Sequence, residues 1–249
     1  MHGLLEVCVD SLASARAAIQ GGADRLELCS ALAVGGLTPY TALLEQIRKE
    51  SDIPIRCLMR PRAGDFLYTK EEVKMLCRQI EVLHCAGATG FVLGFLNADG
   101  TLNRAAMQDC IAACEGAPVT LHRCIDVSEN LERTYRVAHE LGVDTVLTSG
   151  GAANCLLGQD GLARLLTLRD AESGPEVLIG AGVNAEVITA LRKKLPAARA
   201  FHMSGKTELD SQMQFRKEQV PMGLPELDEW TIYQTDPQAI LAARAAVDA

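Results

Sequence analysis

The sequence predicts an α/β fold, namely a single TIM-like (β/α)8 barrel with eight parallel strands and a C-terminal extension. Eight short β-rich runs alternate with segments of helical periodicity, which implies parallel pairing. The 249 residues suit one such barrel, and no Pro-, Gly- or Ser-rich linker divides them. We therefore expect one domain over 1–249, with a tail and a short helix over about 210–249. A doubly wound open sheet is the alternative.

The expected strands are evenly spread up to the extension. They lie near residues 4–9, 24–29, 54–60, 90–95, 118–124, 144–149, 176–181 and 198–203. A weak internal repeat supports this order, because segments 20–28, 85–93 and 140–148 each place glycine where a helix ends, directly before a strand. The last helix is expected from about residue 236 to 247.

The clearest helix follows the third strand. Thr69 and Glu72 have the spacing of a capping box, which satisfies the first free backbone N–H groups of a helix. Apolar residues then recur at helical intervals, and this stripe consists of Val73, Leu76, Cys77, Ile80 and Leu83. The pattern predicts a helix that packs this one face against the barrel.

The composition limits the classes of partner. The formal net charge of −8 argues against sequence-independent nucleic-acid binding, yet a local basic pocket for a small anion remains compatible with it. No apolar stretch is long enough to span a bilayer, so we expect no membrane partner. The nine cysteines are spread through predicted strands and helices. This favours reduced thiols and a cytoplasmic protein without a targeting segment.

Charged residues occupy the face of the strands that points into the barrel. In the first strand Leu5, Val7 and Val9 share one face, so Glu6 and Cys8 share the other. Unpaired buried charge is costly, and a pocket lined by these groups is the simplest explanation. By the same alternation the inward set includes Asp10, Arg25, Glu27, Cys29, Arg56, Arg60, Thr120, His122, His202 and Ser204.

The carboxyl ends of the strands predict an anion site. Active sites of such barrels lie at these ends, and the glycine-rich ends of strands six to eight allow a ligand to approach backbone N–H groups. Arginine side chains can clamp a carboxylate or phosphate. The candidate anion-binding residues are Arg25, Arg60, Arg62, Ser149, Gly150, Gly180, Gly182, Ser204 and Gly205. The alternative is that these arginines only neutralise Glu6 and Glu27.

Several of these polar groups suggest acid–base chemistry. His122 is a candidate acid or base that Asp126 would orient, whereas the structural alternative is a histidine satisfied by its neighbours. The full candidate catalytic set is Glu6, Glu27, Arg60, His122, Asp126 and His202. We expect no nucleotide cofactor, because the segment 180–182 lacks the third glycine of a dinucleotide fingerprint.

Cys8 and Cys29 are the candidate metal ligands. They point inward from neighbouring strands, which lie about 4.8 Å apart, and thiolates select soft ions, Cu(I) above all. The alternative is that both are buried apolar residues. Cys110 and Cys114 also have helical spacing, but together with Met107 they belong to a plain core stripe.

A set of short runs across nearly the whole chain carries a family resemblance. The runs are Glu6–Cys8, Asp10–Ser11, Gly21–Arg25, Glu27–Cys29, Gly35–Pro39, Arg60–Arg62, Gly64–Phe66, His122–Arg123, Asp126, Leu147–Gly150 and Phe215–Arg216. Together they resemble the copper homeostasis protein CutC family. The resemblance implies a cytoplasmic, homodimeric TIM-like barrel, and its proposed Cu(I) ligands match Cys8 and Cys29. The chain departs from the family pattern at Ala63, where glycine is usual, and at Cys124–Ile125.

Two hypotheses about function follow. The first is a cytoplasmic Cu(I)-binding or Cu(I)-trafficking protein whose ligands are Cys8 and Cys29. The second is a barrel enzyme that acts on a small phosphorylated or carboxylated substrate at the C-terminal mouth. The expected partner is therefore a copper ion or a small anion.

Overall fold

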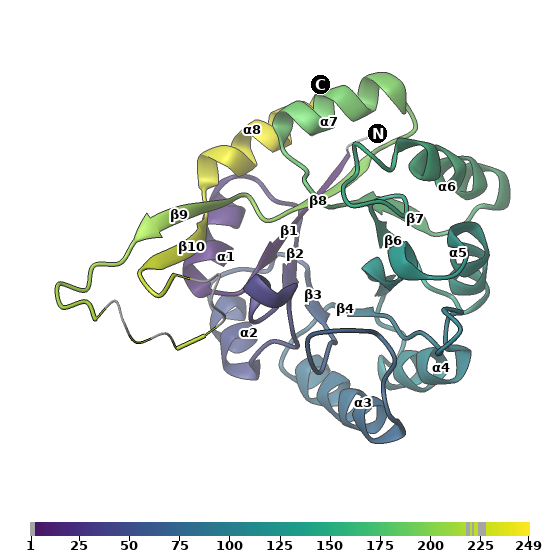
Figure 1. Cartoon of the computed structure of the whole chain (residues 1–249), viewed down its shortest axis with the longest axis horizontal. Coiled ribbons are helices and arrows are strands. Elements are labelled where there is room, and N and C mark those ends of the chain that lie inside the picture. The colour runs from purple at the N-terminus through teal and green to yellow at the C-terminus, as the bar shows by residue number, and fades with distance from the viewer. Residues whose placement is uncertain (1–2, 218–219, 221, 224–227) are drawn as a thin grey trace.

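The eight predicted strands close into a parallel barrel. The computed structural model describes residues 3–217, 220, 222–223 and 228–249. The strands follow the chain order around the barrel, and the eighth pairs with the first (Figure 1). The barrel prediction is confirmed, and the open-sheet alternative is excluded. The strands are β1 (Leu4–Val9), β2 (Arg25–Leu28), β3 (Ile55–Leu58), β4 (Gly90–Leu93), β5 (Val119–Leu121), β6 (Thr145–Thr148), β7 (Glu176–Ile179) and β8 (Ala200–Met203).

Helices surround the strands, as the periodicity predicted. The α-helices are α1 (Leu12–Gln20), α2 (Thr41–Arg48), α3 (Lys70–Cys85), α4 (Arg104–Ala113), α5 (Leu131–Glu140), α6 (Gln159–Glu172), α7 (Ala185–Lys194) and α8 (Pro237–Asp248). Two short 3-10 helices are η1 (Leu32–Val34) and η2 (Arg123–Val127). The capping box of Thr69 and Glu72 begins α3. Gly87 and Gly142, with φ of 103° and 79°, take the left-handed conformation that glycine allows after a helix.

The barrel interior is partly polar, whereas its outer face is apolar. The main core lies between strands and helices and includes Leu5, Val7 and Val9 of β1. Inside the barrel, Leu4 and Cys8 belong to two separate small apolar clusters, and Glu6 comes between them along the strand. The predicted inward face of β1 is therefore confirmed. The charged groups of the interior must be paired there, because they are removed from water.

The C-terminal extension contains a hairpin that the sequence did not predict. β9 (Lys206–Asp210) pairs antiparallel with β10 (Thr231–Thr235), and Figure 1 shows this ribbon projecting from the side of the barrel near α1. Thr235 anchors the ribbon, since its N–H donates to Ser14 and its hydroxyl donates to the carbonyl of Ser204. The expected tail is thus partly ordered as strands, and its final helix α8 is confirmed.

Helix α8 packs against α7 and α1 and closes the outer layer. Its buried residues are Ile240, Ala243 and Val247. Arg244 forms an ion pair with Asp24, which directly precedes β2, and this contact holds the helix against the barrel. Among the described residues, none of the helices combines the length and the hydrophobicity that a bilayer crossing requires.

We predict that Ile240→Ala destabilises the protein by about 2–5 kcal/mol, because it removes a fully buried side chain from the contact between α8 and the barrel. The melting temperature should fall by about 2–4 °C for each kcal/mol. Leu241→Ala is the matched control, since Leu241 is 53% exposed on the same helix. Equal melting temperatures for the two variants would show that α8 does not stabilise the barrel.

Candidate functional site

A cavity of about 870 Å³ opens at the carboxyl ends of the strands. It is large enough for a small organic molecule. Its wall contains polar residues from the strand ends, apolar residues and part of the β9–β10 hairpin. The residues that matter below are Cys8, Asp10, Glu27, Arg60, Phe66, His122, Arg123, Gly182, His202, Ser204 and Lys206.

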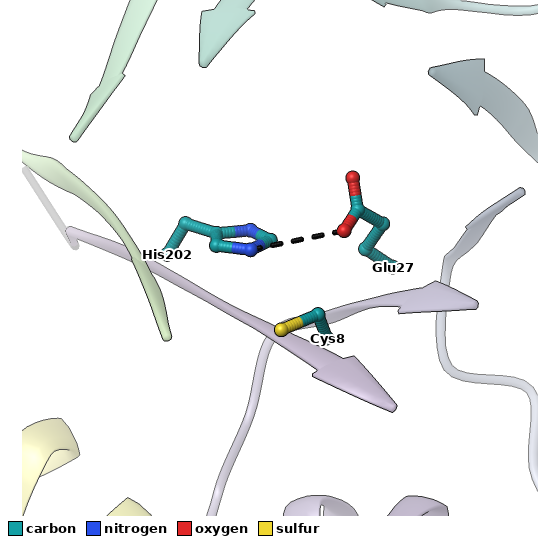
Figure 2. Close-up of side chains that lie close together, drawn as sticks. All are labelled: Cys8, Glu27 and His202. Carbon is teal, nitrogen blue, oxygen red and sulfur yellow. Dashed lines mark ion pairs between the residues drawn. The ribbon is translucent and has the colours of Figure 1, made fainter. Parts of the chain in front are cut away.

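Three potential ligand side chains converge in this cavity. The Sγ of Cys8, a carboxylate oxygen of Glu27 and a ring nitrogen of His202 all lie within 4.8 Å of one another (Figure 2). They come together because β1 is the central strand of three: Cys8 pairs with Glu27 of β2, and Glu6 pairs with His202 of β8. Cys8 and Glu27 are buried, and His202 is half-buried.

Glu6 lies deeper in the barrel than this cluster and contacts one of its members, His202. The side chain is fully buried; it accepts a hydrogen bond from Nε of Arg25 at 2.5 Å and contacts Nδ1 of His202 at 2.8 Å. Burial opposes ionisation, but the positive charges of Arg25 and His202 outweigh it and lower the pKa of Glu6 to about 2. The carboxylate is therefore ionised, and it fixes the orientation of the imidazole ring.

His202 is protonated in this environment. Burial alone would lower its pKa, but Cys8, Glu27 and the hydrogen bond to Glu6 together raise the pKa well above its ordinary value. Its Nδ1–H donates to Glu6, so Nε2 faces Glu27, whose Oε2 lies 3.7 Å away. Burial also raises the pKa of Glu27. Glu27 is thus suited to exchange a proton with Nε2.

Cys29 lies next to this cluster and is not part of it. Its thiol is fully buried and donates to Oε2 of Glu27 at 3.5 Å, and it packs with Cys8 and Leu58. Burial, followed by the charge of Glu27, raises the pKa of Cys29 well above that of a free thiol. The sequence placed Cys8, Glu27 and His202 on the inward face but did not group them. The grouping depends on strand register: β1 pairs with both β2 and β8, which brings Glu27 and His202 next to Cys8.

Arg60 and His122 line the cavity on another side. The guanidinium of Arg60 donates to the carbonyls of Val34 and Gly36 at 2.9 and 3.0 Å, and to that of Gly64 at 3.1 Å. Within the described residues, no carboxylate lies within ion-pair distance of it. A single buried positive charge therefore faces this part of the cavity without an internal counter-charge.

The expected pair of His122 with Asp126 does not form. Nδ1 of His122 accepts the N–H of Cys124 at 3.1 Å, so the ring proton is on Nε2. Burial, with Arg60 nearby, lowers the pKa of His122 to about 3. His122 is thus a neutral hydrogen-bond donor near neutral pH, and the expectation that it works as an acid–base group oriented by Asp126 is corrected.

Asp126 instead accepts hydrogen bonds from the backbone of the glycine-rich turn that follows β6. Its carboxylate accepts the N–H groups of Ser149 and Gly151, each at 3.0 Å, and pairs with Arg123 at 2.8 Å. The anion held by these backbone groups is therefore an internal side chain. Ser149 and Gly150 were expected to bind an external anion. The N–H of Ser149 donates to Asp126 and that of Gly150 donates to the hydroxyl of Thr148, so both backbone donors are already used within the chain.

The remaining anion candidates are distributed differently. Arg62 lies outside the cavity, where it pairs with Glu72 at 2.8 Å. Arg25 does not line the cavity either, because its guanidinium pairs with the buried Glu6. A Cβ atom at Gly180 would collide with Leu147, and one at Gly205 would collide with Ile240. Close packing therefore explains both glycines. Of the predicted anion-binding residues, the cavity wall includes Arg60, Gly182 and Ser204.

Comparison with known proteins places this barrel in a family. The sequence model of the CutC family matches residues 3–207. The chain belongs to the CutC family. A CutC family protein of Vibrio parahaemolyticus is 39% identical over 248 residues, which cover 98% of each chain. One from Agrobacterium fabrum is 40% identical over 193 residues, covering 78% of this chain and 76% of that protein. The resemblance read from the sequence is confirmed.

Solved structures show the same fold. A CutC of Streptococcus agalactiae, whose name assigns it provisionally to copper homeostasis, has a TM-score of 0.75 at 23% identity and covers 81% of this chain and 98% of its own. The phosphoribosyl anthranilate isomerase of Thermotoga maritima has a TM-score of 0.57 at 11% identity and covers 98% of both chains. At these identities the likeness concerns the barrel alone.

We predict that His122→Gln makes stability less sensitive to acid. Because the pKa of His122 is about 3 in the folded protein and near 6.5 in the unfolded chain, the unfolded state binds the extra proton between these values. The wild type should therefore lose about 1.4 kcal/mol per pH unit from this group as the pH falls below 6.5. Urea unfolding at pH 7, 6 and 5 measures it.

The matched control for this prediction is His139→Gln, which removes a half-buried histidine from α5. Each variant is compared with its own stability at pH 7, so a constant loss of packing cancels. If wild type and His122→Gln lose equal stability between pH 7 and pH 5, His122 is not held neutral in the barrel.

Proposed function

We propose that the cavity binds Cu(I) as cargo, with Cys8 and His202 as its principal ligands and Glu27 beside them. The observation that carries this proposal is the convergence of the three side chains within 4.8 Å at the end of the barrel. A thiolate and an imidazole suit this soft ion. The pair Cys8–Cys29, which the sequence and the resemblance suggested, is the competing set of ligands. The family membership supports a role in copper homeostasis.

The surrounding residues prepare His202 for such a role. Ligating histidines commonly donate their other ring N–H to a carboxylate, which fixes the tautomer and the ring orientation. Glu6 makes this contact with Nδ1 of His202 at 2.8 Å, so Nε2 is the ring nitrogen that faces Cys8 and Glu27. Arg25 in turn fixes Glu6.

Binding requires proton release. Cysteine binds a soft ion as the thiolate, and Nε2 of His202 must lose its proton before it can bind, so affinity should fall as the pH drops. Glu27 lies 3.7 Å from Nε2, and its raised pKa makes it a suitable acceptor for that proton. Under this proposal the protein would bind or transfer Cu(I) in the cytoplasm. The cytoplasmic location and the homodimer implied by the resemblance stay predictions.

A competition titration with a Cu(I) chelator under reducing conditions tests the ligand set. Cys8→Ser and His202→Asn should each weaken binding by about 100-fold or more, since loss of a direct ligand should exceed the usual effect of its supporting residues. Cys29→Ser should change affinity by no more than about threefold, because the Cys29 thiol is buried against Glu27. Cys85→Ser is the control, since Cys85 is exposed at the end of α3.

Two results of the titration would change the proposal. Equal losses for Cys8→Ser and Cys29→Ser, with little effect of His202→Asn, would assign the ion to the two thiols. Wild-type affinity in Cys8→Ser would overturn copper binding at this cluster altogether.

A second candidate function is an enzyme that acts on a small anionic substrate at the same mouth. Two observations favour it: a cavity of about 870 Å³ greatly exceeds the size of an ion, and Arg60 faces it without a carboxylate partner among the described residues. In this hypothesis Glu27 and His202 would exchange protons with the substrate. His122 and Asp126, expected in the catalytic set, would have other roles, as a neutral donor and as the internal anion of the β6 turn.

A thermal-shift series with phosphate, sulfate and small carboxylates tests this second function. At least one of these anions should raise the melting temperature of the wild type, because an anion that binds only the folded state stabilises it. The shift should disappear in Arg60→Ala. If none of the anions raises the melting temperature, the backbone carbonyls that accept from Arg60 account for its place in the cavity, and the enzyme hypothesis loses its support.

A further inference from the structure

Among the described residues, three buried polar atoms that have no hydrogen-bond partner lie in one region of the barrel. They are Nε of Arg60, Nε2 of His122 and the hydroxyl of Tyr68. The side chains that carry them are only 8%, 5% and 9% exposed. A buried polar group that lacks a partner is destabilising, so several of them in one place require an explanation.

Nε of Arg60 and Nε2 of His122 are hydrogen-bond donors, whereas the hydroxyl of Tyr68 can donate or accept. Together the three groups carry one positive charge. Arginine supplies that charge. Nδ1 of His122 accepts the N–H of Cys124, so its Nε2 bears the proton, and its lowered pKa keeps the ring neutral. Burial raises the pKa of Tyr68 to about 12, despite the charge of Arg60 and the approach of its guanidinium to the hydroxyl, so the hydroxyl stays protonated. The group is therefore complementary to a singly charged acceptor.

The ring of Phe66 lies next to two members of this group, His122 and Arg60. Its ring lies 4.8 Å from the ring of His122, and the guanidinium of Arg60 lies 5.4 Å from its centre. Phe66 is half-buried and lines the cavity together with Arg60 and His122. Its carbonyl accepts the N–H of Leu96 at 2.8 Å, so the backbone is fixed. Rotation of the side chain is therefore the simplest way to open a path from the cavity to the donors.

We propose that Arg60 and His122 form a carboxylate-binding site, with Phe66 as its side-chain gate and Tyr68 as an adjacent donor. A carboxylate carries one charge and two coplanar oxygens, which match the one charge and the two donors. A phosphate carries more charge at neutral pH than this site balances. The remainder of the ligand would occupy the cavity that also contains Cys8 and His202. This proposal deepens the second candidate function, on which it rests, by naming the class of substrate.

Binding of propionate and of inorganic phosphate, followed by NMR titration of the whole protein, tests the site. The wild type should bind propionate more tightly than phosphate. Arg60→Lys, which keeps the charge but loses the Nε donor, and His122→Phe, which keeps a ring but loses its donor, should each weaken propionate binding by roughly tenfold. His122→Gln, which retains an N–H donor, should recover part of the loss. Phe66→Ala should bind propionate more tightly than the wild type.

Lys206→Gln is the matched control, because Lys206 is another cation in the cavity wall and lies over the ring of Tyr233. It should bind propionate like the wild type. An equal loss in Lys206→Gln and Arg60→Lys would reduce the effect to general electrostatics and overturn the proposal. So would wild-type affinity in both Arg60→Lys and His122→Phe. Melting curves verify that each variant is folded.

The outcomes separate this proposal from those on which it depends. If phosphate binds more tightly than propionate and Arg60 is required, the second candidate function stands and the carboxylate site is wrong. If neither anion binds the wild type, both fail. The Cu(I) affinity of Arg60→Lys and His122→Phe should equal that of the wild type, because neither substitution changes Cys8 or His202.

Discussion

A buried carboxylate at the centre of the barrel organises the candidate site. Glu6 is fully removed from water, and it is stable there only because Arg25 on one neighbouring strand and His202 on the other are both positively charged. The same two contacts orient the imidazole and determine which of its nitrogens faces the cavity. The closed register of β8, β1 and β2 makes this arrangement possible. The orientation of His202 in the cavity thus depends on the buried ion pair of Glu6 with Arg25.

The cavity has two chemically different sides, which correspond to the two candidate functions. Cys8, Glu27 and His202 offer a soft sulfur, a nitrogen and an oxygen on β1, β2 and β8. Arg60 and His122 follow β3 and β5 and offer N–H donors to an anion. Asp126, which is close in sequence to His122, belongs to neither side, because it satisfies the backbone of the β6 turn.

The sequence predicted the barrel because each strand has one apolar face and each helix a clear end. It also placed Glu6, Glu27, Arg60, His122 and His202 inside. It could not predict their partners, which depend on register and on side-chain rotamers. Asp126, for example, could from its place in the sequence contact either His122 or the turn after β6, and it contacts the turn. The β9–β10 hairpin was missed because β9 is exposed along its whole length and β10 shows no alternation of buried and exposed residues. The two strands are also twenty residues apart in the sequence.

X-ray absorption at the copper edge tests the central claim, that Cys8 acts with His202 rather than with Cys29. It is measured on the protein loaded with one equivalent of Cu(I) under reducing conditions. We predict one sulfur and at least one imidazole nitrogen around the ion, with the nitrogen contribution lost in His202→Asn. Two sulfurs and no nitrogen around the ion, with one of the two sulfurs lost in Cys29→Ser, would contradict the account and assign the ion to the two thiols.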